Sequence, residues 1–416
     1  MSRIVFTNAR LLDGDHPAQP GQTVIVDGGR LVYVGDDTTA RLDPSDQQFA
    51  LDGRTLMPGM FQAHWHGSYK GLDFKCLPVG LEQPPGYLML LASTQAKLAL
   101  DCGFTSVIGA ATGAALDAQL KMAIADGIVE GPRIFASGRW LITTGDSNDL
   151  PEYSWWGLTS MGAQRICDGP DEFRKGVRRE ILEGAEVIKI FNDSGHALLY
   201  GSSFLSMNAD ELTAAVEATH QRGKLIRSHV TGKQAILDCI DAGVDILDHV
   251  DQLDVECIDR IVESDTFVCP SVYLLKAILE TVSAQGDGTI DQPFFEVMQQ
   301  DFDNMCRMLP LAARAGAKFM IGDDWGTAMT PHGDYHKEMQ LYVDCGVAEL
   351  DVIRWATRHP AESMNMGKEL GTISTGKIAD LLVINGDPSE DISVLGDQDK
   401  LQLVMTEGKI CKNNLA

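Results

Sequence analysis

The chain has 416 residues, which is long for one ordinary domain but suits a large barrel with a smaller module attached. Hydrophobic residues make up 44% of the sequence and charged residues 22%, the balance of a globular protein rather than a disordered one. The 59 acidic residues outnumber the 34 basic residues, and the formal net charge of −25 argues against nucleic acid and membranes as partners, because both require a basic face.

The first segment, residues 3–55, is expected to form a small β-module. Short β-rich runs occupy residues 4–7, 23–29 and 31–35. The turn Asp27-Gly28-Gly29 between two such runs predicts a β-hairpin. So few strands could hardly bury two faces, so we expect further strands from elsewhere in the chain to complete the module.

From about residue 56 to residue 365, short buried strands alternate with helical stretches such as residues 210–220. The eight strand candidates are residues 57–64, 105–110, 133–138, 186–191, 224–229, 244–249, 266–271 and 318–324. Eight strands with intervening helices match the count and size of a (β/α)8 barrel. A doubly wound open sheet is the alternative, but no glycine-rich phosphate loop follows any of these strands. We therefore predict an α/β fold with a (β/α)8 TIM barrel over residues 57–365.

The β pattern returns after the barrel, in residues 378–387 and 403–410. These strands are expected to complete the N-terminal module, so that residues 1–56 and 366–416 together form a small β-sandwich domain. One long segment, residues 139–169, has no clear pattern. A loop of that size after a barrel strand is usually functional, so we interpret this segment as a lid.

The nine cysteines are scattered, odd in number and free of any CxxC spacing. This usage favours reduced thiols over a disulfide framework or a zinc ribbon. The chain starts directly in a strand-like pattern without a charged-then-apolar signal sequence, and no apolar run is long enough to span a bilayer. We therefore expect a cytoplasmic protein.

Histidines stand at the ends of several predicted barrel strands, where side chains converge on one mouth. Strand one ends in His64-Trp65-His66. Alternation along a strand places both histidines on one face, roughly 6.5–7 Å apart, which suits chelation of one metal ion. An isolated pair of this kind is more often part of a surface turn. The case for a metal site therefore depends on further ligands at the other strand ends. Strand five ends in His229 and strand six in His249.

Strand eight ends in two carboxylates, Asp323 and Asp324. Four histidines and a carboxylate suit zinc or a similar divalent ion. Strand four contributes Lys189, a lysine inside an otherwise apolar run. An ammonium group beside divalent metals would be repelled and costly to bury. Carbon dioxide would convert this lysine into a carbamate, an anionic bridge with one oxygen for each of two metals.

These residues, in this order, resemble the amidohydrolase superfamily, whose binuclear members carry HxH, a carbamylated lysine, two further histidines and an aspartate. The resemblance covers nearly the whole chain. Pro58-Gly59-Met60 resembles the family's opening motif, and residues 371–381 resemble its closing strand. Within the superfamily, residues 168–174 and 184–190 most resemble the branch of prolidase-like and other Xaa dipeptidases, together with imidazolonepropionase relatives.

The resemblance implies a ligand set and a reaction. One divalent metal would be held by His64, His66, Lys189 and Asp324, and the second by Lys189, His229 and His249. A metal-bridging hydroxide would attack the amide carbonyl, and Asp324 would accept its proton and pass it to the leaving nitrogen. Asp323 is the rival base, but Asp324 occupies the place of the family's aspartate.

Two departures from the dipeptidase pattern leave the substrate open. Such relatives carry a histidine after strand three and a tyrosine shortly after the strand-five histidine. Here the corresponding residues are Asp146 or Ser147, and Val230 or Thr231. An N-acyl amino acid, a carbamate or a urea is therefore an alternative substrate.

Two further histidines, with Asp146, are candidates for touching the substrate. His196 follows strand four and His332 follows strand eight, so both are expected near the barrel mouth.

The leading hypothesis is a hydrolase of carbon–nitrogen bonds with two divalent metals, expected to be zinc, and an Xaa dipeptidase or prolidase-like activity. We expect a small-molecule substrate and a homo-oligomeric assembly. A mononuclear deaminase is the nearest rival, but such enzymes place a glutamate where this chain has Gly232, and Lys189 would then have no role. A catalytically dead scaffold is the rival that is not an enzyme, and its usual mark is a missing ligand, whereas the whole set is present here.

Overall fold

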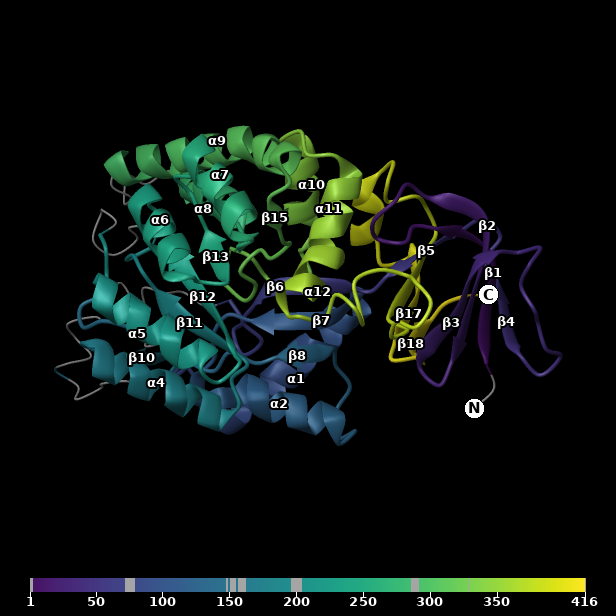
Figure 1. The fold of residues 1–416 in the computed structure, drawn as a ribbon, viewed down its shortest axis with the longest axis horizontal. Coiled ribbons are helices and arrows are strands. Elements are labelled where there is room, and N and C mark those ends of the chain that lie inside the picture. The colour runs from purple at the N-terminus through teal and green to yellow at the C-terminus, as the bar shows by residue number, and fades with distance from the viewer. Residues whose placement is uncertain are drawn as a thin grey trace.

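Strands from the two ends of the chain share one sheet in the computed structural model, which describes residues 3–71, 79–146, 149, 155, 162–195, 204–285, 292–327 and 329–415. The strands are β1 (Ile4–Leu11), β2 (Gln19–Asp27), β3 (Arg30–Asp36), β4 (Gln47–Ala50), β5 (Thr55–Pro58), β16 (Leu381–Ile384), β17 (Leu401–Thr406) and β18 (Lys409–Asn413). Their order is β18-β17-β16-β5-β1-β2-β3, and β4 pairs with β1. Figure 1 shows the N-terminal strands in purple beside the C-terminal strands in yellow.

The predicted hairpin is confirmed. β2 and β3 pair antiparallel, with Asp27 opposite Arg30. The two residues between them, Gly28 and Gly29, have φ values of 56° and 80°. A two-residue turn with both φ values positive matches the twist of the strands that it joins, and glycine adopts it without a steric penalty. The sheet closes over an apolar cluster to which both chain ends contribute, including Phe6, Val24 and Leu403.

The structure contains a strand at each of the eight predicted barrel positions. They are β6 (Met60–Trp65), β7 (Phe104–Gly109), β8 (Arg133–Phe135), β11 (Val187–Phe191), β12 (Leu225–Val230), β13 (Ile246–His249), β14 (Phe267–Cys269) and β15 (Lys318–Phe319). Three of these strands form the sheet β6-β7-β8, and the other five, β11 to β15, lie side by side in chain order within a seven-stranded sheet. Each neighbouring pair is parallel. The fold is therefore mixed α/β with parallel sheets.

The segment 139–169, which showed no pattern in the sequence, contains two further strands. β9 (Trp140–Ile142) pairs with β11, and β10 (Gln164–Ile166) pairs with β9, so both extend the seven-stranded sheet. The sequence did not reveal these two strands, although β8 and β14, which are equally short, were predicted.

Backbone hydrogen bonds connect both edges of the three-stranded sheet to the seven-stranded sheet. The amide of Ala63 in β6 donates to the carbonyl of Ile321 after β15, at 2.8 Å. The amide of Glu186 before β11 donates to the carbonyl of Ala136 after β8, at 2.7 Å. The first and last strands of the series are thus neighbours in space.

Helices follow the strands and lie outside the parallel sheets (Figure 1). They are α1 (Pro85–Asp101), α2 (Leu116–Ala125), α4 (Pro170–Glu183), α5 (Ala209–His220), α6 (Lys233–Ala242), α7 (Val255–Ser264), α8 (Val272–Gln285), α9 (Gln292–Ala315), α10 (His336–Asp344), α11 (Glu349–Ala356) and α12 (Arg358–Ser363), with short 3-10 turns at Gly113–Ala115 and Ile392–Gly396. No helix within the described ranges has both the length and the apolar character needed to cross a membrane.

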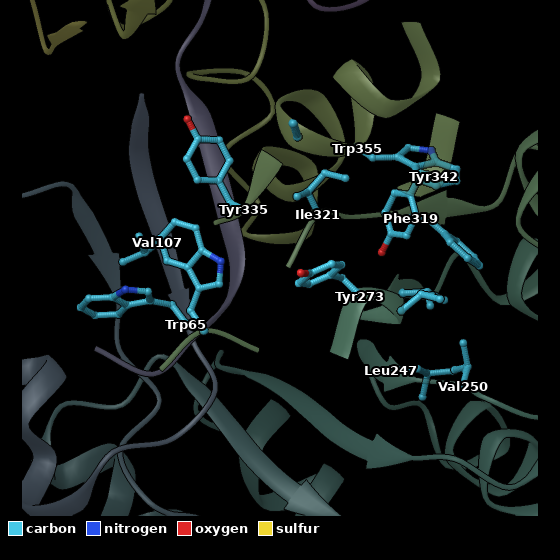
Figure 2. Close-up of a cluster of buried hydrophobic side chains, with 14 of the residues drawn as sticks. Trp65, Val107, Leu247, Val250, Tyr273, Phe319, Ile321, Tyr335, Tyr342 and Trp355 are labelled. Carbon is cyan, nitrogen blue, oxygen red and sulfur yellow. The ribbon is translucent and has the colours of Figure 1, made fainter. Parts of the chain in front are cut away.

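The helix ends show why these segments begin and stop where they do. α5 begins at a capping box in which Asn208 and Glu211 exchange side chain to backbone hydrogen bonds. α4 begins with Pro170 in its first turn and ends at Gly184, whose φ is 113°. The helices pack on the strands through one large apolar core (Figure 2), which includes Trp65 and Trp355.

Candidate metal centre

Four histidine rings meet where the parallel strands end. His64 and His66 lie at the end of β6, with ring centroids 5.2 Å apart. His229 on β12 and His249 at the end of β13 have centroids 4.3 Å apart. His64 and His249 join the two pairs at 5.2 Å. All four side chains are buried, so the structure brings together histidines that are far apart in the sequence.

Asp324 faces the first histidine pair. Its Oδ1 atom lies 2.9 Å from Nε2 of His66 and 3.5 Å from Nε2 of His64. The ligand atoms of these three residues all lie within 4.8 Å of one another, and all three residues are buried. Two imidazole nitrogens and a carboxylate at this spacing are a donor set for a divalent ion.

The Nε2 atoms of His64 and His66 face Asp324. The hydrogen bonds of the other ring nitrogen, Nδ1, determine where each ring carries its proton. Nδ1 of His66 lies 3.0 Å from the carbonyl of Ala111, so Nδ1 carries the proton. Nδ1 of His64 lies 3.2 Å from the hydroxyl of Ser271. That hydroxyl donates its single proton to the carbonyl of Gly322, at 2.5 Å, and must therefore accept from His64. In their neutral form both rings therefore carry the proton on Nδ1 and present an unprotonated Nε2, as metal-binding histidines do.

This tautomer leaves a lone pair of His66 and a carboxylate oxygen of Asp324 facing each other at 2.9 Å. Two acceptors that close repel each other unless a cation or a proton lies between them. Burial and the nearby cations Lys189 and Arg227 hold the pKa of His64 well below its usual range, so that ring is neutral at pH 7. The residues present therefore fit a divalent metal ion.

Lys189 reaches the same cluster from β11. Its side chain is buried, and Nζ lies 5.3 Å from the centre of the Phe191 ring, which stacks on His229 at 4.6 Å. Nζ donates to Oδ2 of Asp248 at 2.5 Å. Burial lowers the pKa of the Lys189 amine, although Asp248 opposes the shift. All six residues predicted as metal ligands thus lie in one buried cluster.

Three residues of this cluster have a left-handed backbone conformation. The φ angles are 76° at His249, which closes β13, 51° at Ser271, two residues after β14, and 59° at Asp324, five residues after β15. Such a φ is uncommon for residues other than glycine, costs of order 1–3 kcal/mol, and is concentrated at functional sites. Hydrogen bonds oppose the strain, since the Thr330 hydroxyl donates to the Asp324 carbonyl at 2.8 Å.

Glycine is required where the loop after β11 crosses the cluster. Gly195 has a φ of 77°, and a Cβ atom there would lie 2.7 Å from Nε2 of His229. Any side chain at this position would therefore press on the His229 ring.

The rival carboxylate, Asp323, has different surroundings from Asp324. Asp323 is fully buried, and its Oδ1 accepts a hydrogen bond from Gln62 at 3.0 Å. Its Oδ2 has no hydrogen-bond partner among the residues that the structure describes, and burial raises the pKa of this carboxyl well above its usual range. Asp324, by contrast, contacts both histidines of β6.

Two of the three predicted substrate contacts, His332 and Asp146, lie in the part of the chain that the structure describes. His332 packs edge-on against Trp325 at 5.4 Å, and burial lowers its pKa to about 4. Asp146 is fully buried, four residues after β9, the strand in which Trp140 lies opposite Lys189. His196 lies outside the described residues.

Sequence reasoning missed three residues that support the cluster: Ser271, Arg227 and Asp248 as a charge partner. Arg227 had a usable signal, because it is a charged residue inside a buried strand and lies two positions before His229, on the same face. Ser271 had none, because only the fold brings it to His64, 207 positions away.

The chain is similar to known proteins over most of its length. Residues 55–411 match the model of the amidohydrolase family. The ochratoxinase of Aspergillus niger is 27% identical over 382 residues, which cover 86% of this chain and 75% of that protein.

Two solved structures extend the comparison. A crystal structure of an Xaa-Pro dipeptidase with bound methionine in the active site matches with a TM-score of 0.86 and 25% identity over 99% of this chain and 100% of that one. A prolidase complexed with N-methylphosphonate-L-proline matches with a TM-score of 0.85 and 27% identity, over 99% and 100%. The chain belongs to the amidohydrolase family, and with it to the enzymes that hydrolyse carbon–nitrogen bonds.

Proposed function

We propose that this chain is a binuclear metal-dependent hydrolase of amide bonds. One divalent ion would be held by His64, His66, Lys189 and Asp324, and the second by Lys189, His229 and His249. The observation that carries the proposal is the approach of two acceptors, Nε2 of His66 and Oδ1 of Asp324, to 2.9 Å in a buried site. Nitrogen and oxygen donors together suit zinc, which we propose as the metal.

We further propose that the eight parallel strands form a closed (β/α)8 barrel, with the metal centre at its C-terminal mouth. The hydrogen bonds from Ala63 to Ile321 and from Glu186 to Ala136 support closure. A barrel mouth explains why ligands from β6, β11, β12 and β13 share one site.

The proposed chemistry divides between the ions and the protein. Bound divalent ions would polarise the amide carbonyl and lower the pKa of water, so that hydrolysis runs near neutral pH. Asp324 would accept the proton of the attacking water on its carboxylate and deliver it to the leaving nitrogen. Its position against both β6 histidines supports this role, whereas Asp323 is turned to Gln62 and burial raises the pKa of its carboxyl.

The buried amine of Lys189 is the proposed site of carbamate formation. The neutral amine nitrogen would form a bond to the carbon of carbon dioxide and lose one proton to solvent, leaving an anionic carbamate. Burial favours the neutral amine that this reaction needs, since it lowers the pKa of Lys189. The product would place a negative charge in the middle of the metal centre, where an ammonium group would repel the ions.

For the substrate, we propose an Xaa dipeptide and a prolidase-like activity. The similarity to an Xaa-Pro dipeptidase and to a prolidase over nearly the whole chain supports this choice. N-acyl amino acids, carbamates and ureas are the alternative, and one observation favours them. Val230 is buried and the Thr231 hydroxyl faces Asp193 at 3.2 Å, so neither residue supplies the phenol of dipeptidase relatives.

A substrate screen of the metal-loaded protein tests the proposal. The panel holds Xaa-Pro and other dipeptides, N-acyl amino acids, carbamates and ureas at equal concentration, with Asp324→Asn protein as the matched control. The proposal expects release of free amino acid from dipeptides by the wild type only. Turnover of N-acyl amino acids, carbamates or ureas without dipeptide cleavage would show that the proposed dipeptide substrate is wrong. Deamination of a nucleobase would contradict the proposed reaction.

A further inference from the structure

The strand that carries His64 and His66 contains a β-bulge. Along the pairing of β6 with β7, Gln62 lies opposite Val107 and Trp65 lies opposite Gly109. Three steps on β6 thus match two steps on β7, and the extra residue falls at Ala63 or His64. A bulge bends and twists a strand, and bulges beside active sites re-aim side chains. The direction of both histidines therefore depends on how this bulge is held.

The backbone groups at the bulge have partners outside the pairing of β6 with β7. The Ala63 amide donates to Ile321, and the His64 amide donates to the side-chain oxygen of Gln62 at 2.9 Å. The Ala63 carbonyl accepts a hydrogen bond from Nη1 of Arg227 at 2.8 Å. A buried carbonyl without a donor would be costly, so Arg227 supplies what the bulge removes.

Arg227 joins the strands that carry the proposed ligands. Its side chain is fully buried on β12, two residues before His229. Nη1 also donates to the Gly109 carbonyl of β7 at 3.0 Å. Nε and Nη2 form a bidentate pair with Asp248, at 3.0 and 2.5 Å. Asp248 precedes His249 on β13 and also accepts a hydrogen bond from Nζ of Lys189 on β11.

A fully buried ion pair is weak evidence for stability, because apolar side chains of equal volume often stabilise a fold as well or better. The fork of Arg227 is instead suited to fixing position, since its planar donors bind a carboxylate and backbone carbonyls in set directions. A lysine at this place would keep the charge but lose that geometry.

We propose that Arg227 is a positioning residue for the metal centre: it holds the β6 bulge through Ala63 and β13 through Asp248, and so sets the spacing between the His64–His66 pair and the His229–His249 pair. This inference rests on the proposed metal site. It adds a residue that contacts no metal and no substrate but determines how tightly the site binds its ions.

The test compares Arg227→Lys and Arg227→Met with Arg133→Lys as a matched control. Arg133 also forms a fork of ion pairs, to Asp380 at 2.7 Å and Glu407 at 2.6 Å, but it lies at the start of β8, away from the strand ends that carry the ligands. For each full-length protein we would measure cobalt(II) affinity by chelator competition, the visible spectrum of bound cobalt(II), the melting curve, and deuterium exchange of residues 60–67 in the metal-free state.

The inference expects both Arg227 variants to bind cobalt(II) about 10–100-fold more weakly, as is typical when a partner of a metal ligand is lost. Their cobalt(II) spectra should change and their 60–67 segment should exchange faster, whereas Arg133→Lys should change only the melting curve. Arg227→Lys keeps the test valid if Arg227→Met does not fold. Wild-type affinity and spectra in a folded Arg227 variant would overturn the inference alone, and a wild type that binds no cobalt(II) would overturn the proposed function with it.

Discussion

Replacing Ser271 by alanine should weaken metal binding without unfolding the protein. The Ser271 hydroxyl accepts the Nδ1 proton of His64 at 3.2 Å and donates to the Gly322 carbonyl at 2.5 Å. Ser271→Ala leaves both buried groups without this partner. An unsatisfied buried polar group costs about 1–3 kcal/mol, and His64 becomes free to move its proton to Nε2, where it blocks metal binding.

At about 1.4 kcal/mol for each factor of ten, this loss corresponds to roughly 5–150-fold weaker metal affinity. Isothermal titration of metal-free protein with zinc measures it directly. Ser363→Ala is the matched control, because Ser363 is also buried and its hydroxyl donates to the Pro360 carbonyl at 2.9 Å, far from the cluster in sequence. Equal zinc affinity in Ser271→Ala and wild type would refute the tautomer argument.

Three further predictions follow from the same geometry. Lys189→Ala should lose bound metal and activity, with partial rescue by small carboxylic acids in a turnover assay, and full activity without rescue would contradict a bridging role. Asp324→Asn should keep bound metal, because an amide oxygen can still coordinate, but should reduce turnover by about 10²–10⁴-fold. Asp323→Asn should keep its turnover. If Asp323→Asn loses turnover and Asp324→Asn does not, Asp323 is the base. Metal-free protein should lose stability as pH falls from about 6.5 to 4, because His332, with its pKa lowered to about 4, stays neutral in the fold while the unfolded chain binds the proton. Melting curves across this pH range, with His332→Asn as the comparison, should show a smaller loss in the variant.

Long, regular features of the fold could be predicted from the sequence. The eight parallel strands appear at the predicted positions, and the Gly28-Gly29 turn forms the expected hairpin. The strands β9 and β10 were missed, although β8 and β14, which were predicted, are equally short. β15 is shorter than predicted and ends at Phe319.

The ligand candidates were visible because each is a polar residue at or near the end of an apolar strand, and strand ends of a barrel converge. Their supporting residues were not visible for a physical reason. The hydrogen bond from His64 to Ser271 and the contact of Arg227 with Ala63 join residues 207 and 164 positions apart, and they depend on the bulge in β6. Sequence periodicity carries no information on such pairings.

The metal content of the purified full-length protein tests the central claim most directly. Elemental analysis by plasma mass spectrometry, on protein expressed with zinc and carbon dioxide present, should find close to two divalent ions per chain, falling towards none in Lys189→Ala. A folded wild-type protein that retains no divalent ion, and whose melting curve is unchanged by added zinc, would contradict the proposed metal centre.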